Sequence, residues 1–565
     1  MRLSFLTLPA CAVMCLAAGA GFAQTTNTSS MPTDSGVRGP TAGTLQFNAM
    51  QTYFLTGQLP QSPPIPHPPL ISLNGGIAAT INETALFNEG INRAGQLEST
   101  CDVCAMVTDG SPATGSNEID PFFPQFTTNS NGLGARHNSD QCFGCHFQPT
   151  LGGSGGFLVP NPAQVALRQA PPQLPENPQF NLIPHRFGKQ NTVPSFEQQF
   201  GPMREVRFIY KVDPVTGNFL SSTPTLSTSA VVPIGNRIFD GGVHQLWIVK
   251  GIQGDTTISQ CAISQPNFAQ QVAQNNVAFR IPLQMLGLGL IDSIQDREIL
   301  ARQTLAQQNG AAALGITGHP NRSGNDGTIT RFGWKAQNKS ITMFAGEAYN
   351  VELGITNELF PTATEEDPAC QGSNKPEPND VTRTANDDSG NQSFFKPIHI
   401  LADWMEFQVM MRFTDAPAPM ANPSQSAQKG AVTFSQIGCA LCHTPQMVTA
   451  PVMNSAVLQN RPVNLFSDLL VHHMGPGLAD GISQGQAGPD EFRTVPLWGV
   501  GQRIFFLHDG RTSDLLQAIL AHRSNAGVGA GGLVYPASEA NQVINNFNAL
   551  STNAQQGILD FLRSL

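Results

Sequence analysis

The sequence predicts a mainly α-helical chain with two domains of related organisation, and three observations lead to this fold class. A C-x-x-C-H motif occurs twice, at residues 142–146 and 439–443. The chain has 54 glycines and 43 prolines but only 12% charged residues, which favours short helices joined by ordered loops. Apolar residues recur at helical spacing in 427–438 and 552–565, on either side of the second motif.

The C-x-x-C-H spacing is typical of covalent haem c attachment. Two thiols add across the haem vinyl groups, and the adjacent His ligates the iron. A redox C-x-x-C pair or half of a zinc site is the weaker alternative, because neither motif has a second C-x-x-C or a His pair at zinc-finger spacing. We therefore expect two covalently bound haem c groups, held by Cys142, Cys145 and His146 and by Cys439, Cys442 and His443.

The first 23 residues have the features of a cleaved signal peptide. Arg2 precedes an uncharged apolar run, and small residues stand before Gln24. A lipoprotein site at Cys11 is a weaker alternative, because Pro9 fits that pattern poorly. Since haem c is attached outside the cytoplasm in bacteria, we expect a periplasmic or secreted protein, soluble and without a transmembrane span in the mature chain.

Composition divides the rest of the chain into four parts. They are an N-terminal arm with a proline-rich spacer (24–84), a first haem c domain with insertions such as the acidic 365–392 (85–413), a linker (414–426) and a C-terminal cytochrome c domain (427–565). Thr552 and Gln555 predict a capping box that starts the last helix. The expected fold is therefore two c-type cytochrome domains, with long loop-rich insertions in the first.

An internal repeat and the net charge add two further expectations. Residues 279–291 resemble residues 492–504, which indicates related domains, although two unrelated Pro/Gly turns before helices would look similar. The formal net charge of −10 disfavours nucleic acid and anionic membrane surfaces as partners, and it would suit a small basic electron donor.

Several short segments resemble a known family. The sequence from Phe492-Arg-Thr to Phe506-Leu-His508-Asp509-Gly510 resembles the C-terminal domain of bacterial di-haem cytochrome c peroxidases, relatives of the enzyme that matures the tryptophan cofactor of methylamine dehydrogenase. Other segments resemble the branch of di-haem "thiol oxidoreductases", namely 132–134, 152–155, 201–208, 331–336, 354–360 and 485–493. The resemblance covers about residues 85–565.

The resemblance implies a sixth iron ligand for the C-terminal haem on the helix after His508-Asp509-Gly510. That position is His522, and a His there implies bis-His coordination and a lower redox potential. Four alternatives stay open, namely Met474, Met447, His472 and His473. His508 itself is expected to orient a haem propionate or the backbone.

The resemblance makes the haem at His146 the catalytic one. His185 resembles the loop His that covers this haem in the peroxidases, although a surface His is the alternative. His137 is expected near the haem edge. Peroxide chemistry also needs an acid–base group, and Asp292 and Glu298 are the candidates, with local salt bridges as the alternative.

Two further sets of residues have expected roles. Trp334 or Trp247 could carry electrons between the haems, with core packing an equal alternative for both. The four remaining cysteines are expected to form two structural disulfides, although a redox dithiol at the first two is the alternative; they are Cys101, Cys104, Cys261 and Cys370.

The leading functional hypothesis is a periplasmic di-haem c oxidoreductase of peroxidase type. A C-terminal electron-transfer haem would feed a catalytic N-terminal haem, with peroxide or dioxygen as oxidant and a small electron-donor protein or quinol-linked donor as reductant. A bridging Ca²⁺ has no support in the sequence. The alternatives are a haem dioxygenase of the rubber-oxygenase type and a non-enzymatic electron-transfer cytochrome.

Overall fold

A computed structural model describes the larger part of the chain. The described residues are 31–37, 83–95, 97–99, 129–131, 133–134, 136–156, 177, 179, 191–223, 231–248, 263–362, 403–450 and 458–565. The signal peptide, most of the N-terminal arm, the 365–392 insertion and His185 lie outside them, and so do the cysteines Cys101, Cys104, Cys261 and Cys370. Contacts divide the chain into Met1–Met31 and Pro32–Leu565, and the second unit contains everything described below.

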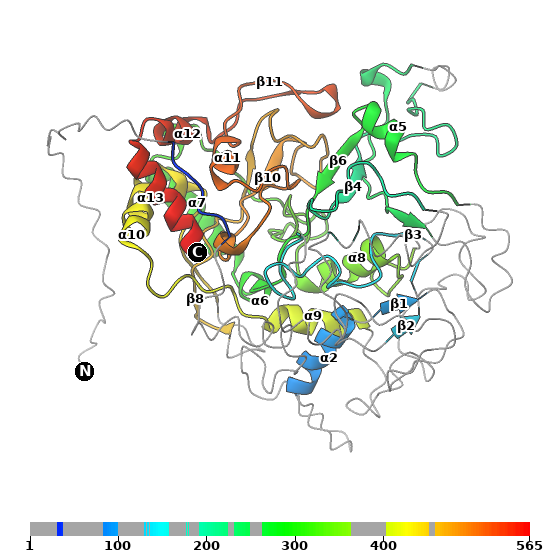
Figure 1. The fold of residues 1–565 in the computed structure, drawn as a ribbon, viewed down its shortest axis with the longest axis horizontal. Helices are drawn as coiled ribbons and strands as arrows, with labels where there is room; N and C mark the ends of the chain where they lie inside the picture. The colour runs from blue at the N-terminus through cyan, green and yellow to red at the C-terminus, as the bar shows by residue number, and fades with distance from the viewer. Residues whose placement is uncertain are drawn as a thin grey trace, which may run out of the picture. The chain divides into compact units, whose positions relative to one another are not determined.

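Helices dominate this unit, and none of the described helices exceeds 13 residues, which confirms the prediction of short helices (Figure 1). The α-helices are α2 (Glu83–Gly95), α5 (Phe268–Ala273), α6 (Leu288–Asp292), α7 (Asp296–Gln308), α8 (Ile341–Leu353), α9 (Asp403–Phe413), α10 (Gln425–Gln436), α11 (Leu515–Leu520), α12 (Asn541–Asn548) and α13 (Thr552–Ser564). The 3-10 helices are η3 (Ile234–Asn236), η5 (Ala312–Leu314), η8 (Cys439–Leu441), η10 (Val500–Gln502) and η11 (Ala530–Gly532). In the part of the chain that the structure describes, no helix is long and apolar enough to cross a membrane.

The strands are short and form six two-stranded sheets among the described residues. They are β1 (Leu97–Ser99) with β2 (Asn129–Asn131), β3 (Arg136–His137) with β5 (Trp247–Ile248), β4 (Glu205–Phe208) with β6 (Val277–Arg280), β7 (Met447–Val448) with β8 (Pro462–Val463), β9 (Val471–His473) with β10 (Glu491–Arg493), and β11 (Gly527–Val528) with β12 (Val534–Tyr535). Only β1 and β2 run parallel.

Each C-x-x-C-H motif follows a helix that crosses a later helix. α10 precedes the second motif and packs on α13, while α2 precedes the first and packs on α9 (Figure 1). Both crossings are close because a glycine faces the partner. A Cβ on Gly430 would lie 1.7 Å from the Gly557 carbonyl oxygen, and one on Gly90 would lie 2.4 Å from that of Glu406. Any larger side chain at Gly90 or Gly430 would push the helices apart.

The internal repeat of the sequence has a structural counterpart. Gly289 in the first copy packs against the carbonyl of Arg412 near the end of α9, and Gly501 in the second packs against the carbonyl of Arg563 near the end of α13. A Cβ at these glycines would lie 1.9 Å and 2.1 Å from those oxygens. The two copies therefore make the same contact with their own closing helix, which favours a repeat over two unrelated turns.

The predicted helices around the second motif are confirmed, with one correction at the last. Ala427, Gly430 and Phe434 form the buried side of α10. The cap of α13 is Ser551, whose hydroxyl accepts from the Ala554 N–H, so the capping box predicted at Thr552 and Gln555 is wrong by one residue. The Gln555 side chain instead donates to the Phe547 carbonyl.

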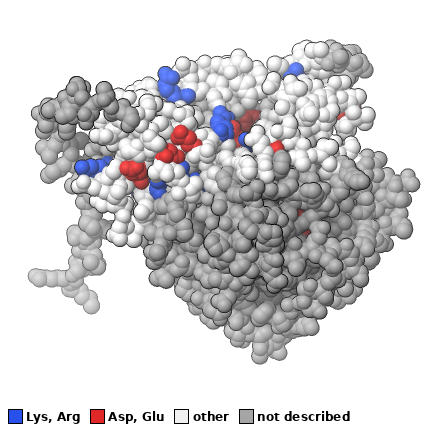
Figure 2. All heavy atoms as spheres, in the orientation of Figure 1, with Lys and Arg blue, Asp and Glu red and all other residues white. Residues whose placement is uncertain are grey.

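Two large apolar clusters surround the two motifs. The first includes Phe143 and Phe147 together with side chains of α2, α8 and α9. The second joins α10, α11 and α13 through residues such as Phe434 and Phe561. On the face shown in Figure 2, the described charged side chains form small groups of both signs separated by uncharged residues.

Candidate functional site

The second motif lies on the wall of a cavity of about 230 Å³. Cys439 and Cys442, in and directly after η8, line it together with His443. His522, just beyond the end of α11, lines the same cavity. Most of the other lining residues are apolar, among them Phe434, Leu497, Phe506, Val543 and Ile544.

Both imidazoles in this cavity are oriented by backbone carbonyls. His443 Nδ1 donates to the Phe466 carbonyl at 3.1 Å, and His522 Nδ1 donates to the Ala518 carbonyl at 2.8 Å. Burial lowers the pKa of His443 to about 4, with a further contribution from His522, and burial also lowers the pKa of His522. Each ring is therefore neutral with Nε2 left as the lone-pair nitrogen, which is the form that ligates iron.

The alternative ligands lie in different surroundings. Met474 lines the cavity, whereas Met447 is buried in the first apolar cluster. Both ring nitrogens of His472 are engaged, at 2.9 Å from Asp468 and 2.8 Å from Glu539. His473 is not among the lining residues. His522 and Met474 therefore remain as second-ligand candidates in the cavity, and the choice of His522 stays a prediction.

The first motif lines a second cavity, of about 130 Å³. Cys142, Cys145 and His146 all face it. His146 Nδ1 donates to the Gly153 carbonyl at 3.1 Å, and burial lowers the pKa of the ring to about 4. The Gly153 carbonyl therefore orients the His146 ring as the Phe466 carbonyl orients that of His443.

Charged side chains from distant segments converge on this N-terminal cavity. They include Glu205 and Arg207 of β4, Arg280 of β6 and Glu352 of α8. Glu352 hydrogen-bonds Glu205 and accepts from the Asn138 amide at 2.8 Å. Burial and then the charge of Glu205 raise the pKa of Glu352, so Glu352 holds the shared proton. Burial opposes ionisation of Glu205, but Arg207 and Arg280 outweigh it and lower its pKa.

The acid–base candidates predicted from the sequence lie elsewhere. Asp292 pairs with Arg412 at 3.0 Å, and Glu298 pairs with Arg302 at 2.7 Å. Neither carboxylate is among the residues lining either cavity, so the geometry favours the local salt bridges. His137 is fully buried, bonds the Gly134 carbonyl and is not a lining residue either.

Trp334 lines both cavities. Its indole N–H donates to the Ile281 carbonyl at 2.9 Å, and its ring meets His508 edge-on with centroids 6.3 Å apart. Trp247 is buried beside β3 and lines neither cavity. Of the two predicted aromatic candidates, only Trp334 stands between the sites.

Trp334 and His508 occupy equivalent places in two similar turns. Phe332 forms a β-bridge with Asn338 before α8, and Phe506 forms one with Thr512 before α11. The two bridges have the same sequence spacing. Side-chain N-caps follow, Ser340 for α8 and Asp514 for α11. The eighth residue after the cap is Ala348 in the first turn and His522 in the second, and each lines its own cavity.

A chain of buried charges also connects the two cavities. Arg280, on the wall of the N-terminal cavity, pairs with Asp480 at 2.7 Å, and Asp480 pairs with Lys335 at 3.1 Å. The Lys335 Nζ lies 4.1 Å from the ring centroid of Phe492, which stacks on His508 at 4.2 Å. Phe492 and His508 line the C-terminal cavity.

The side chains present fit a haem c group in each cavity. None of the four motif cysteines forms a disulfide, and each pair lies beside a buried His whose lowered pKa keeps its ring neutral. Arg493 and Arg503 line the C-terminal cavity, and within the described chain Arg493 Nη1 and Arg503 Nε are buried without a hydrogen-bond partner. Burial lowers the pKa of both guanidinium groups to about 10. Such buried cations need anionic partners, and haem propionates would supply them.

Sequence reasoning missed the charged set of the N-terminal cavity. Arg204-Glu-Val-Arg207 and Phe279-Arg280 had been identified only as family-like or repeated segments. The available signal was the alternation of charged and apolar residues in 205–208, because Glu205 and Arg207 share one face of that strand.

Comparison with known proteins supports the same family. A sequence model of the family described as "Di-haem oxidoreductase, putative peroxidase" matches residues 252–558, more than half of the chain. The matched range includes the second C-x-x-C-H motif but not the first. Among solved structures the chain is similar to a "MauG-like protein associated with microbial copper homeostasis", at 16% identity and a TM-score of 0.28, over 44% of this chain and 79% of that one. No curated protein matches the chain.

Proposed function

Because the chain belongs to this di-haem oxidoreductase family, we propose that it is a periplasmic di-haem c oxidoreductase of peroxidase type. Electrons from a small donor protein or a quinol-linked donor would enter at the C-terminal site and pass to the N-terminal site, where peroxide is reduced. The observation that carries this proposal is a difference among the described residues: the C-terminal cavity is mainly apolar with imidazoles at His443 and His522, whereas the N-terminal cavity is charged and has only the imidazole of His146.

The residues that would hold the haems follow from the two cavities. Cys439 and Cys442 would attach one haem, with His443 and His522 as iron ligands. Cys142 and Cys145 would attach the other, with His146 as the ligand; Ala348, at the position that matches His522, offers none. Bound haem would supply a redox-active iron at each site, and among the described residues only the C-terminal site offers a second imidazole to close it against an oxidant.

The chemistry of the N-terminal cavity depends on proton supply. Reduction of one hydrogen peroxide to two waters consumes two electrons and two protons. Glu352 holds a proton in its hydrogen bond to Glu205, so it can serve as the general acid. Arg207 and Arg280 keep Glu205 ionised and would stabilise negative charge that develops on the departing oxygen.

The C-terminal cavity is suited to electron transfer. Most of its lining residues are apolar, and His443 and His522 would both be available to ligate a bound iron, which would leave no position for a substrate. Trp334 provides an aromatic ring in the wall that the two cavities share. Inter-haem electron transfer through this ring is therefore the expected route.

A resting-state electron paramagnetic resonance spectrum with haem quantification tests the proposal. We expect two covalent haems per chain, one low-spin and one high-spin, and rapid oxidation of the reduced protein by hydrogen peroxide. A stable dioxygen adduct in a peroxide-inert protein would instead favour the dioxygenase alternative. Two low-spin haems that bind neither peroxide nor carbon monoxide would leave only an electron-transfer cytochrome.

A further inference from the structure

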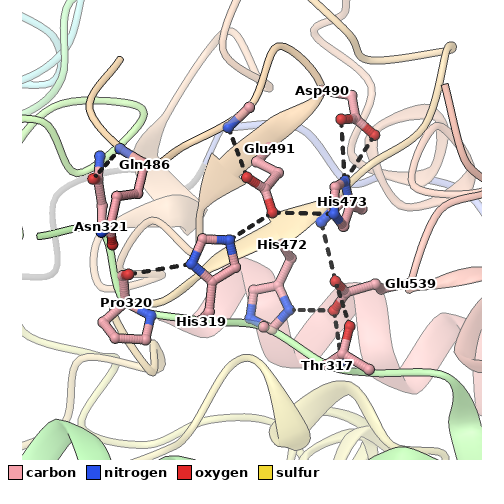
Figure 3. Close-up of polar contacts among 12 residues, drawn as sticks. Thr317, His319, Pro320, Asn321, His472, His473, Gln486, Asp490, Glu491 and Glu539 are labelled. Atoms are coloured by element: carbon pink, nitrogen blue, oxygen red, sulfur yellow. Dashed lines mark hydrogen bonds and ion pairs between the residues drawn. The ribbon is translucent and has the colours of Figure 1, made fainter. Parts of the chain in front are cut away.

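A second group of ligand-type side chains lies outside both cavities, where three chain segments run side by side. His473 on β9 stands opposite Glu491 on β10, and His319 forms a β-bridge with Val471 at the other end of β9. Backbone pairing thus holds the two imidazoles and the carboxylate together. Figure 3 shows both rings turned toward the Glu491 carboxylate.

The two rings converge on a single oxygen atom. His319 Nε2 lies 2.8 Å from Glu491 Oε1, and His473 Nε2 lies 3.2 Å from the same oxygen. The other oxygen, Oε2, accepts the Gly488 N–H at 2.6 Å. Glu491 Oε1 is therefore left to the two histidines.

Each ring is oriented through its other nitrogen. His319 Nδ1 donates to the Pro320 carbonyl at 3.2 Å, and His473 Nδ1 donates to the Asp490 carboxylate at 3.1 Å. These acceptors direct both Nε2 atoms to Glu491. Carbonyl or carboxylate partners on Nδ1 are what metal-ligating histidines usually have.

The exposure and charge of these side chains favour a cation between His319, His473 and Glu491. The carboxylate side chains of Asp490 and Glu491 are only 3% and 4% exposed, whereas the side chains of His473 and His319 are 40% and 41% exposed. Two buried carboxylates need positive charge nearby, which protons on the imidazoles or a metal ion can provide. The half-exposed rings have room to move and leave a path to solvent.

We propose that His319, His473 and Glu491 form a binding site for a divalent transition-metal ion of the zinc and copper type. The ion would replace the protons between the two Nε2 atoms and Glu491 Oε1, and water would complete its coordination. Metal–ligand bonds to such groups are about 2.0–2.2 Å, so the two exposed rings would have to rotate toward a shared ion. Imidazole and carboxylate ligands suit Zn²⁺ and Cu²⁺. None of the three residues lines a haem cavity, so the site is independent of the proposed peroxidase chemistry.

Zinc titration of the haem-loaded protein tests this site, because Zn²⁺ exchanges no electrons with the haems. Isothermal titration calorimetry should find one tight Zn²⁺ per chain. The double variant His319→Ala/His473→Ala should bind that ion more than about 100-fold more weakly, and Asp490→Asn about 10–100-fold more weakly, since loss of the outer partner alone has that effect. His244→Ala is the matched control, because His244 also pairs with a carboxylate, Asp240 at 2.9 Å, but has no second imidazole at that carboxylate. It should bind Zn²⁺ like the parent protein.

Anomalous diffraction at the zinc edge gives a second, direct readout. A peak between His319 Nε2, His473 Nε2 and Glu491 is expected in zinc-soaked crystals. Unchanged zinc affinity in the double variant, no tight site in the parent protein or a peak elsewhere would overturn the proposal. Haem absorbance spectra of each variant check that it is folded.

Discussion

The two cavities are built on similar local structure but differ in what they present to a bound group. Near each cavity a helix before the C-x-x-C-H motif packs closely on a later helix, α2 on α9 and α10 on α13. Each cavity also has a turn closed by a β-bridge that leads into a helix with a side-chain N-cap, α8 or α11. The helix after the turn brings His522 to one cavity and Ala348 to the other. Among the described residues, a methyl group at Ala348 therefore stands where the C-terminal site has the His522 imidazole, and this difference underlies the proposed division into a closed and an open site.

The rest of each cavity wall also differs between the two sites. The C-terminal cavity has mainly apolar walls around its histidines, whereas the N-terminal cavity has a protonated Glu352 beside ionised Glu205 and two arginines. Acid–base groups are useful only where a substrate can reach the iron. The comparison teaches that the two properties go together among the described residues: the cavity with the second imidazole lacks a proton donor such as Glu352, and the cavity with Glu352 has Ala348 in place of that imidazole.

The largest effect is expected from the motif histidines. His146→Ala should abolish peroxide reduction, whereas His443→Ala should leave the first reaction with peroxide intact and slow the re-reduction that follows, because only His146 belongs to the open site. Stopped-flow absorbance with hydrogen peroxide measures both steps. Equal loss in the two variants would contradict the division of labour.

Ala348→His tests whether one residue accounts for the difference in closure. The new imidazole enters the N-terminal cavity at the position equivalent to His522, so we expect a second low-spin haem and loss of peroxide reactivity. Electron paramagnetic resonance reports the spin state. Ala348→Leu is the control, because it fills space without offering a ligand and should leave the haem high-spin.

Glu352→Gln removes the proposed general acid. We expect peroxide turnover to fall about 10²–10⁴-fold, the usual contribution of such a group. Burial raises the pKa of Glu352, so the parent enzyme should lose activity as pH rises through that pKa, where the proton is lost. The variant should lack this dependence. Glu298→Gln, at a carboxylate outside both cavities, is the control and should behave like the parent.

His522→Ala should open the C-terminal site. The low-spin signal should convert to high-spin or to a Met-ligated form through Met474, with a higher redox potential in the second case. Resonance Raman spectra and potentiometry distinguish these outcomes. An unchanged low-spin signal would remove His522 from the site.

Trp334→Phe is expected to have the smallest effect. It keeps an aromatic ring in the shared wall but loses the hydrogen bond to Ile281, a loss of about 1 kcal/mol in stability. Inter-haem electron transfer, followed by flash photolysis, should slow while peroxide binding is unchanged. Trp247→Phe is the matched control, since Trp247 lines neither cavity, and equal slowing there would contradict a special role for Trp334.

The sequence predicted what depends on local spacing. The two motifs and the helices around the second motif follow from short-range patterns, whereas the choice of His522 followed from the family resemblance. The sequence could not predict which residues far apart in the chain would form contacts. Glu205 and Glu352 meet only because β4 and α8 fold together, while Asp292 and Glu298, chosen for their place after the repeat, find partners on α9 and within α7. Whether the two regions are c-type domains stays a prediction.

The buried charge chain from Arg280 through Asp480 to Lys335 has one more consequence. It is buried, begins at Arg280 on the wall of the N-terminal cavity and ends at Lys335, which contacts Phe492 in the wall of the C-terminal cavity. Shielding keeps such charges strongly interacting. Reduction at one haem site should therefore shift the reduction potential of the other. A stepwise redox titration would show two interdependent waves. The two sites would then show redox cooperativity, in which the reduction potential of each depends on the oxidation state of the other.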